Sequence, residues 1–168
     1  CYDEGKRIAE TLCSDYQRIH NLDIRIMRIF NTYGPRMKAN DGRVVSNLIC
    51  QALQNKPLTI YGDGLQTRSF CYVDDLIDGM FNLMKSNTKS PTNIGNPEEI
   101  TILELAKKIK EKINPKLEIV YKPLPQDDPF KRKPDITKAK SNLEWRPKIS
   151  LDNGLDKTVS WFKNLLDD

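Results

Sequence analysis

Residues 24–36 read IRIMRIFNTYGPR, and the change from a strand-like segment to a polar loop within this stretch indicates the fold class. Residues 24–30 alternate and are rich in isoleucine, which is typical of a β-strand. The Gly34-Pro35 pair then marks a loop directly after the strand. In an open α/β sheet, ligands bind in loops at the carboxyl ends of strands. We therefore expect the polar side chains that follow the strand, Asn31 first, to lie near a ligand.

Helical and strand-like segments alternate on both sides of this stretch. We expect helices at residues 2–19, 44–53, 74–84, 101–113, 138–143 and 151–166. Further strands are expected at residues 58–61, 68–73, 92–94 and 117–121, and a polar loop at 123–134. Asp74 and Asp75 are expected to supply the third helix with an N-cap and with negative charge that matches the helix dipole, and Thr101 and Glu104 form a capping-box pattern. The alternation predicts one compact α/β unit.

Two helices carry apolar residues at the spacing of a buried face. In the first helix these are Ile8, Ala9, Leu12, Cys13, Tyr16 and Ile19. In the third they are Leu76, Ile77, Met80, Phe81 and Met84. Both stripes are predicted to pack against the rest of the unit.

The composition limits the function classes. The chain has 168 residues, 38% of them hydrophobic and 30% charged, and no apolar run long enough for a membrane span. The net charge of +4 fits a small anionic ligand, and without an arginine-rich tract we do not expect nucleic acid as a partner. The four cysteines form no CxxC pair, and with the single His20 they predict no metal site. Reduced thiols in a cytoplasmic protein are the simpler interpretation.

Tyr2 and Lys6 lie four residues apart on the first predicted helix, so their side chains share one face. A free tyrosine has a pKa of about 10, too high for a base at neutral pH. A nearby ammonium group favours the phenolate and makes the tyrosine a better base. An exposed first turn, in which Tyr2 packs and Lys6 is solvated, explains the same two residues without catalysis.

The segments around Tyr2 and Lys6 favour the tyrosine base over the exposed first turn. They are YDEGKR at 2–7, RIFNTYGPRM at 28–37, DGRVVSN at 41–47, GLQTRSF at 64–70, NIGNPEE at 93–99 and KRKPD at 131–135. In this order they resemble the extended short-chain dehydrogenase/reductase family over essentially the whole chain, and within it the UDP-glucuronate decarboxylases. The resemblance implies the C-terminal part of such an enzyme: the last strands and helices of a Rossmann-like fold with a small mixed α/β substrate-binding subdomain.

The resemblance also implies the reaction and the catalytic pair. NAD would oxidise the 4-hydroxyl of UDP-glucuronate, and the resulting β-keto acid would lose carbon dioxide before the ketone is reduced to give UDP-xylose. Tyr2 would take the hydroxyl proton, and Lys6 would lower the pKa of Tyr2 and bind the nicotinamide ribose. The full-length enzyme is expected to be a homodimer.

Further cofactor and substrate contacts are implied by position. Thr32 and Arg43 would lie near the cofactor, and Asn31 would donate to the substrate unless it ties down its own turn. Arg36 lies in a basic loop suited to an anion. Tyr16 is on the helix side of Tyr2 and could touch the substrate or the core.

Four more residues are expected at the nucleotide sugar. Arg68 can grip a diphosphate with its planar fork, and we favour binding over acid catalysis because arginine stays protonated. Tyr61 could border the uracil or simply pack in its strand. Arg132 and Asp135 would hold phosphate and ribose, although Asp135 could instead cap the helix that follows.

The sequence departs from the family pattern at its start. A glycine-rich dinucleotide loop and the acidic residue for the adenosine ribose are absent, and Gly62-Asp63-Gly64 is no substitute because no long helix follows directly. The dinucleotide-binding half is therefore expected to be missing, and the chain alone to be inactive. A nucleotide-sugar 4-epimerase or 4,6-dehydratase, or a non-catalytic nucleotide-sugar-binding module, remain alternatives.

Overall fold

The computed structural model describes residues 1–124 and 131–167, so residues 125–130 of the expected polar loop lie outside it. Its helices are α1 (Tyr2–His20), α2 (Val44–Leu53), α3 (Val73–Lys85), α4 (Ile102–Ile113), α5 (Thr137–Leu143) and α6 (Leu151–Asp167). Its strands are β1 (Met27–Ile29), β2 (Thr32–Tyr33), β3 (Leu58–Tyr61), β4 (Thr67–Ser69), β5 (Cys71–Tyr72), β6 (Thr92–Ile94), β7 (Glu99–Thr101), β8 (Ile119–Lys122) and β9 (Lys131–Arg132). The predicted α/β class is confirmed.

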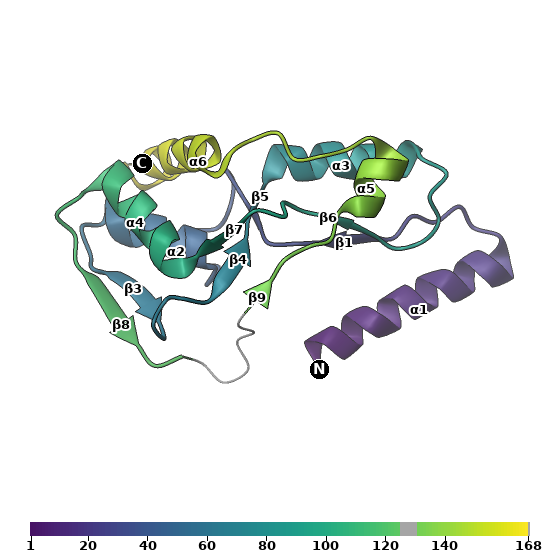
Figure 1. Ribbon diagram of the computed structural model, residues 1–168, viewed down its shortest axis with the longest axis horizontal. Helices are drawn as coiled ribbons and strands as arrows, with labels where there is room; N and C mark the ends of the chain where they lie inside the picture. The colour runs from purple at the N-terminus through teal and green to yellow at the C-terminus, as the bar shows by residue number, and fades with distance from the viewer. Residues whose placement is uncertain (125–130, 168) are drawn as a thin grey trace.

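The strands form short, mostly parallel pairings. β1 pairs with β6, β2 with β5 and β3 with β8, each in parallel. β4 lies between β7, which is antiparallel to it, and β9, which is parallel. Parallel pairs need crossover connections, and the helices between the paired strands provide them. The result is two lobes side by side, with α2, α4 and α6 in one and α3 and α5 in the other (Figure 1).

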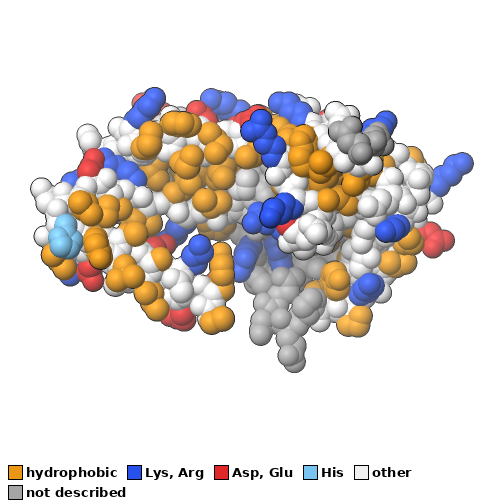
Figure 2. Space-filling view, turned by 180° about the vertical axis from the view of Figure 1, so that it is seen from behind, with side chains coloured by type: hydrophobic (Ala, Val, Ile, Leu, Met, Phe, Trp, Pro, Cys, Tyr) orange, Lys and Arg blue, Asp and Glu red, His pale blue; other side chains and the backbone are white. Residues whose placement is uncertain are grey.

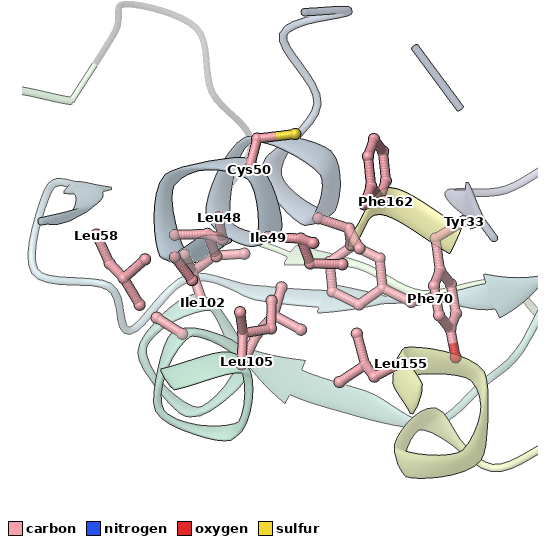
Figure 3. Packing of buried hydrophobic residues seen from close by; sticks show 14 of the residues in the cluster. Tyr33, Leu48, Ile49, Cys50, Leu58, Phe70, Ile102, Leu105, Leu155 and Phe162 are labelled. Carbon is pink, nitrogen blue, oxygen red and sulfur yellow. The ribbon is translucent and has the colours of Figure 1, made fainter. Parts of the chain in front are cut away.

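The larger core lies between α2, β3, α4 and α6. Leu48 and Ile49 of α2 face Leu105 of α4 and Leu155 of α6, and the ring of Tyr33 closes one end (Figure 3). The Tyr33 hydroxyl donates to the carbonyl of Leu151 over 3.2 Å, and burial raises the pKa of that phenol. This core positions the strands that carry Tyr61 and Arg68.

The smaller core joins α3, α5 and β6 around Trp145, which is almost completely buried. The carboxylate of Asp75 is also buried and accepts hydrogen bonds from the backbone amides of Lys148 and Ile149. Asp75 therefore holds the segment after α5 against α3. The helix begins at Val73 with Tyr72 at its N-cap, so the predicted N-cap role of Asp74 and Asp75 is wrong. Both lie in its first turn, where their negative charge matches the helix dipole as predicted.

The predicted buried face of α3 is also largely wrong. Leu76 is buried, but Ile77, Met80, Phe81 and Met84 are exposed. The helix instead turns Gly79 inward: a side chain there would come within 2.7 Å of Ile94 and 2.9 Å of Trp145. Because only a glycine permits this close approach, the helix packs along its Gly79 side and leaves its bulky stripe outside.

Helix α1 forms as predicted, but its apolar face is not buried. None of its residues is buried, and the side chains of Ile8, Leu12, Tyr16 and Ile19 are exposed. α1 stands apart from the two lobes in Figure 1. In Figure 2, hydrophobic side chains gather over this end of the molecule. Among the described helices, none is long and apolar enough to cross a membrane.

Candidate active site

A cleft of about 1570 Å³ separates α1 from the two lobes. The first two-thirds of α1 form one wall, and the opposite wall comes from β1, the start of α2, β3, β4 and β9. Figure 2 shows Lys and Arg side chains around the hollow beside α1. The cleft is larger than the roughly 300–1000 Å³ of an ordinary ligand pocket.

Tyr2 and Lys6 lie on the cleft side of α1. The Lys6 ammonium is 5.5 Å from the centre of the Tyr2 ring, the distance of a cation–π contact. Both side chains are exposed, so ligand atoms can reach them. The helical spacing thus produces the proximity expected from the sequence.

Asn31 and Thr32 line the cleft at the carboxyl end of β1. The Asn31 carbonyl accepts from the amide of Cys71, which fixes the backbone between β1 and β2. The Asn31 side chain makes no hydrogen bond to any residue in the described ranges, so it does not tie down its own turn there. The Thr32 hydroxyl donates to the Phe30 carbonyl over 2.8 Å. Asn31 is therefore the amide available to a ligand.

Arg68 and Arg132 are direct neighbours on the parallel strands β4 and β9. Both line the cleft, opposite α1. The Arg68 side chain is only 8% exposed, and its Nη1 donates to the carbonyl of Thr67 over 2.8 Å. Both residues are cations, so together they attract an anion to this wall of the cleft. This pair has the chemistry of a phosphate or diphosphate site.

Tyr61 and Arg43 also line the cleft, from two different elements. Tyr61 is exposed at the end of β3, where its ring can contact a planar group. Arg43 directly precedes α2, and its Nε lies 3.6 Å from the carboxylate of Asp41. That carboxylate also accepts from the Ser46 hydroxyl and so fixes the start of α2. Arg43 is thereby held at the cleft rim.

Three predicted site residues do not line the cleft. Arg36 is exposed in the loop after β2. Tyr16 lies exposed on α1 with its ring 5.1 Å from that of His20, so it occupies neither the core nor the cleft. Asp135 accepts a hydrogen bond from the amide of Thr137 at the start of α5, but the N-cap position of that helix is Ile136, so Asp135 is not its cap. Hydrogen bonds with the side chain and the backbone of Thr137 lower the pKa of Asp135.

Sequence reasoning left several polar residues of the cleft unassigned. Among them are Glu10, Arg28, Gln66 and Lys122. Glu10 continues the four-residue spacing of Tyr2 and Lys6, a signal that could have found it. Lys122 is the register partner of Tyr61 on β8, a relation that only the pairing of distant strands reveals.

Residues 1–95 of the 168 match the NAD dependent epimerase/dehydratase family. The chain belongs to this family. Two proteins that are similar to this chain are UDP-glucuronic acid decarboxylases. UDP-glucuronic acid decarboxylase 1 from Arabidopsis thaliana is 58% identical over 164 residues, and that from Danio rerio is 54% identical over 167. These alignments cover 98% and 99% of this chain but only 38% and 40% of the relatives, so the chain spans about two-fifths of their length.

Solved structures confirm the Rossmann-like α/β fold. UDP-glucose 4-epimerase from Thermotoga maritima, determined with UDP-glucose, superposes with a TM-score of 0.92 at 34% identity. That match covers 96% of this chain and 52% of the epimerase. UDP-glucuronic acid 4-epimerase from Bacillus cereus, in complex with UDP-glucuronic acid and NAD, gives a TM-score of 0.86 at 33% identity and covers 93% and 50%.

Proposed function

We propose that this chain is the C-terminal, sugar-nucleotide-binding portion of an NAD-dependent UDP-glucuronate decarboxylase. The observation that carries the proposal is the placement of two functional pairs, a tyrosine with a lysine and two arginines, across one cleft. Tyr2 and Lys6 lie on one wall, and Arg68 and Arg132 lie side by side on the other. A diphosphate held by the arginines would leave the sugar to extend toward the tyrosine. The identity to named decarboxylases supports the choice of reaction.

The cleft residues fit NAD as the second ligand. Lys6, Thr32 and Arg43 offer an ammonium, a hydroxyl and a guanidinium group along the α1 side and the rim. We propose that these three, with Tyr2, contact the cofactor. NAD, when bound, supplies a hydride acceptor for C4 of the sugar. The volume of the cleft supports its occupation by a dinucleotide beside a sugar nucleotide.

The chain's own residues would divide the work by their chemistry. Tyr2 takes the proton of the 4-hydroxyl and returns one in the final reduction, and the Lys6 ammonium favours the phenolate form of Tyr2. The Asn31 amide donates to the sugar, and the Tyr61 ring borders the uracil. Arg68 and Arg132 grip the diphosphate through charge-assisted hydrogen bonds. Arg68 binds rather than donates a proton, because a guanidinium group does not deprotonate in proteins.

The catalytic role of Tyr2 is tested in a chimera in which this chain replaces the matching 164 residues of the Arabidopsis relative. Tyr2→Phe removes the general base, so we expect turnover of UDP-glucuronate to fall by about 10²–10⁴-fold. Tyr121→Phe is the matched control, since Tyr121 is exposed on β8 away from the cleft. A Tyr2→Phe chimera that turns over at the parent rate would remove Tyr2 from the mechanism.

The arginine pair is tested separately in the 168-residue chain by calorimetric titration with UDP. Arg132→Ala removes an exposed cleft cation and is expected to weaken binding roughly tenfold, the value of one charge-assisted hydrogen bond. Arg146→Ala, which removes an exposed arginine elsewhere, should leave affinity unchanged. Equal affinities for the two variants would contradict a diphosphate site at this pair.

The similar solved structures support 4-epimerisation as a second candidate reaction. Two of them are 4-epimerases that share this fold. Product mass separates the reactions: decarboxylation loses carbon dioxide, dehydration loses water and epimerisation leaves the mass unchanged. A non-catalytic binding module would bind UDP through the arginines and ignore the Tyr2→Phe change.

We further propose that the full-length enzyme is a homodimer that uses α1. The exposed stripe of Ile8, Leu12 and Ile19 supports this, because apolar stripes of this size mark interaction sites. Sedimentation of the chimera tests it: a parent dimer that Leu12→Glu does not weaken would exclude this face.

For its location we propose the cytoplasm. All four cysteines are free, and burial raises the pKa of the Cys71 thiol to about 12. Free thiols favour a reducing compartment. Fractionation of the source cells tests this, and recovery from a secretory compartment would overturn it.

A further inference from the structure

A single ion pair connects α1 to the strands behind the cleft. The carboxylate of Glu10 on α1 accepts two hydrogen bonds from Arg28 on β1, from Nε and Nη2, each over 2.6 Å. Within residues 1–124 and 131–167, no other hydrogen bond or ion pair joins a side chain of α1 to a residue beyond the helix. Since α1 also buries no residue, this pair is its side-chain link to the rest of the described chain.

We propose that Glu10 and Arg28 are positioning residues that hold Tyr2 and Lys6 across the cleft from Arg68 and Arg132. This inference rests on the function proposed above. Neither residue is assigned a contact with substrate. Their role is to fix the angle of the helix that carries the catalytic pair.

The geometry of the helix explains why one pair suffices. An α-helix is a stiff rod, and α1 is already joined to β1 through residues 21–26 at its carboxyl end. Glu10 lies ten residues from that end, about 15 Å along the axis. A rod held at two points this far apart cannot swing. The two parallel hydrogen bonds also fix direction, which a single contact would not.

Both partners are placed where they can transmit position. Glu10 is on the same face as Tyr2 and Lys6, at successive four-residue steps. Arg28 lies three residues before Asn31 on the same backbone, and β1 is itself anchored to β6 with Arg28 opposite Asn93. The ion pair therefore joins the wall that carries the base to the wall that carries the substrate amide.

The pair also protects the contact between Lys6 and Tyr2. An unpaired Glu10 carboxylate would compete for the Lys6 ammonium, which lies one helical turn away. With Arg28 bound, the carboxylate is occupied by a fixed cation, and its pKa is lowered by the hydrogen bond from Arg28. Lys6 can then stay near the ring of Tyr2, 5.5 Å from its centre.

A structural experiment on the 168-residue chain tests the attachment directly. Residual dipolar couplings report the orientation of α1 relative to α2 and α4. We expect one shared alignment for all three helices in the parent chain, and strongly averaged α1 couplings in Arg28→Met and in Glu10→Gln. Asp15→Asn is the matched control, because it removes an equally short ion pair with Arg18 that lies wholly within α1. Unchanged α1 couplings in Arg28→Met would overturn the proposal.

An activity experiment on the chimera tests the consequence for catalysis. Since small displacements of reacting groups cost up to about 100-fold in rate, we expect Arg28→Met to lower kcat by about 10- to 100-fold. The KM for UDP-glucuronate should change little, because Arg68 and Arg132 remain. The exchanged pair Glu10→Arg with Arg28→Glu should recover most of the lost kcat. An unchanged kcat, or a loss that appears only in KM, would overturn the positioning role.

The two experiments separate this inference from the proposed function. A parent chimera without decarboxylase activity would count against the proposed function. The dipolar couplings alone would then show whether Glu10 and Arg28 hold α1 in place. An active parent chimera, together with unaltered α1 couplings in the variants, would contradict the positioning role of Glu10 and Arg28 and would not affect the proposed function.

Discussion

Helices α1 and α4 have the same kind of apolar periodicity but differ in whether their apolar residues are buried. In α4, Ile102, Leu105, Ala106 and Ile109 are all buried, whereas α1 buries none of its residues. The spacing in both sequences predicts an apolar face equally well. What differs is whether this chain provides a surface to cover the face. Periodicity thus shows that a helix has a face to bury, and only the rest of the fold shows what covers it.

The two helices are also held by different forces. α4 begins in a complete capping box between Thr101 and Glu104 and packs into the larger core. α1 has no side-chain cap at its start and is held by the pair of Glu10 and Arg28. Segments with few buried contacts open at lower free energy than core segments. We therefore expect α1 to undock while the two lobes stay folded.

The largest expected difference comes from the same substitution in each helix. Leu105 is fully buried, so Leu105→Ala should lower the free energy of unfolding by about 2–5 kcal/mol. Leu12 is 53% exposed, and Leu12→Ala should change it by less than about 0.5 kcal/mol. Urea titration of the 168-residue chain measures both. Similar losses for the two variants would mean that α1 is packed in solution, contrary to the structure.

A pair of helical glycines gives an intermediate effect. A side chain at Gly154 of α6 would lie 2.0 Å from the Tyr33 hydroxyl, so Gly154→Ala should cost about 1–3 kcal/mol of stability through overpacking. A side chain at Gly5 of α1 would meet no described atom within 4 Å. Gly5→Ala should therefore raise the helicity of α1, by up to about 1 kcal/mol of helix propensity. Thermal unfolding and circular dichroism test both. A stable Gly154→Ala protein would contradict this packing of Tyr33.

Local signals in the sequence predicted the secondary structure well where a whole segment forms a single helix or strand. The bounds of α2 and β3 agree residue for residue with the expected 44–53 and 58–61, and the capping box of α4 forms as predicted. Residues 68–73 were expected to be one strand. They are divided between β4 and β5, whose partners belong to different sheets, and the helix takes Val73. Nothing local in the segment signals that division.

The site was predicted where chemistry follows from spacing or from a loop signal. Tyr2, Lys6 and Asn31 reach the cleft for these reasons. The adjacency of Arg68 and Arg132 could not be predicted, because it depends on the pairing of two strands that are distant in the sequence. Arg36 was chosen by its charge and Asp135 by the family resemblance, and neither lines the cleft. A charged residue type alone does not show where its side chain points.

The smallest expected difference between α1 and α4 is in their response to acid. The pKa of Glu10 is lowered by its hydrogen bonds with Arg28, so the pair stabilises the docked helix above the ordinary glutamate pKa of 4.5. That contribution disappears as the pH falls through the lowered value. The hydrogen bond with Glu10 raises the pKa of Arg28, so Glu10 is the group of this pair that titrates.

Because Arg28 is 52% exposed, solvent screens the pair, and less than about 1 kcal/mol is at stake. Amide chemical shifts of α1 between pH 6 and about 3 should therefore report undocking of this helix while those in the core of α4 stay native. In Glu10→Gln the charged pair is already absent at pH 6, so the shifts of α1 should show no such transition. An α1 transition that survives in Glu10→Gln would assign the acid response to another carboxyl, and α1 would then be held by contacts other than this pair.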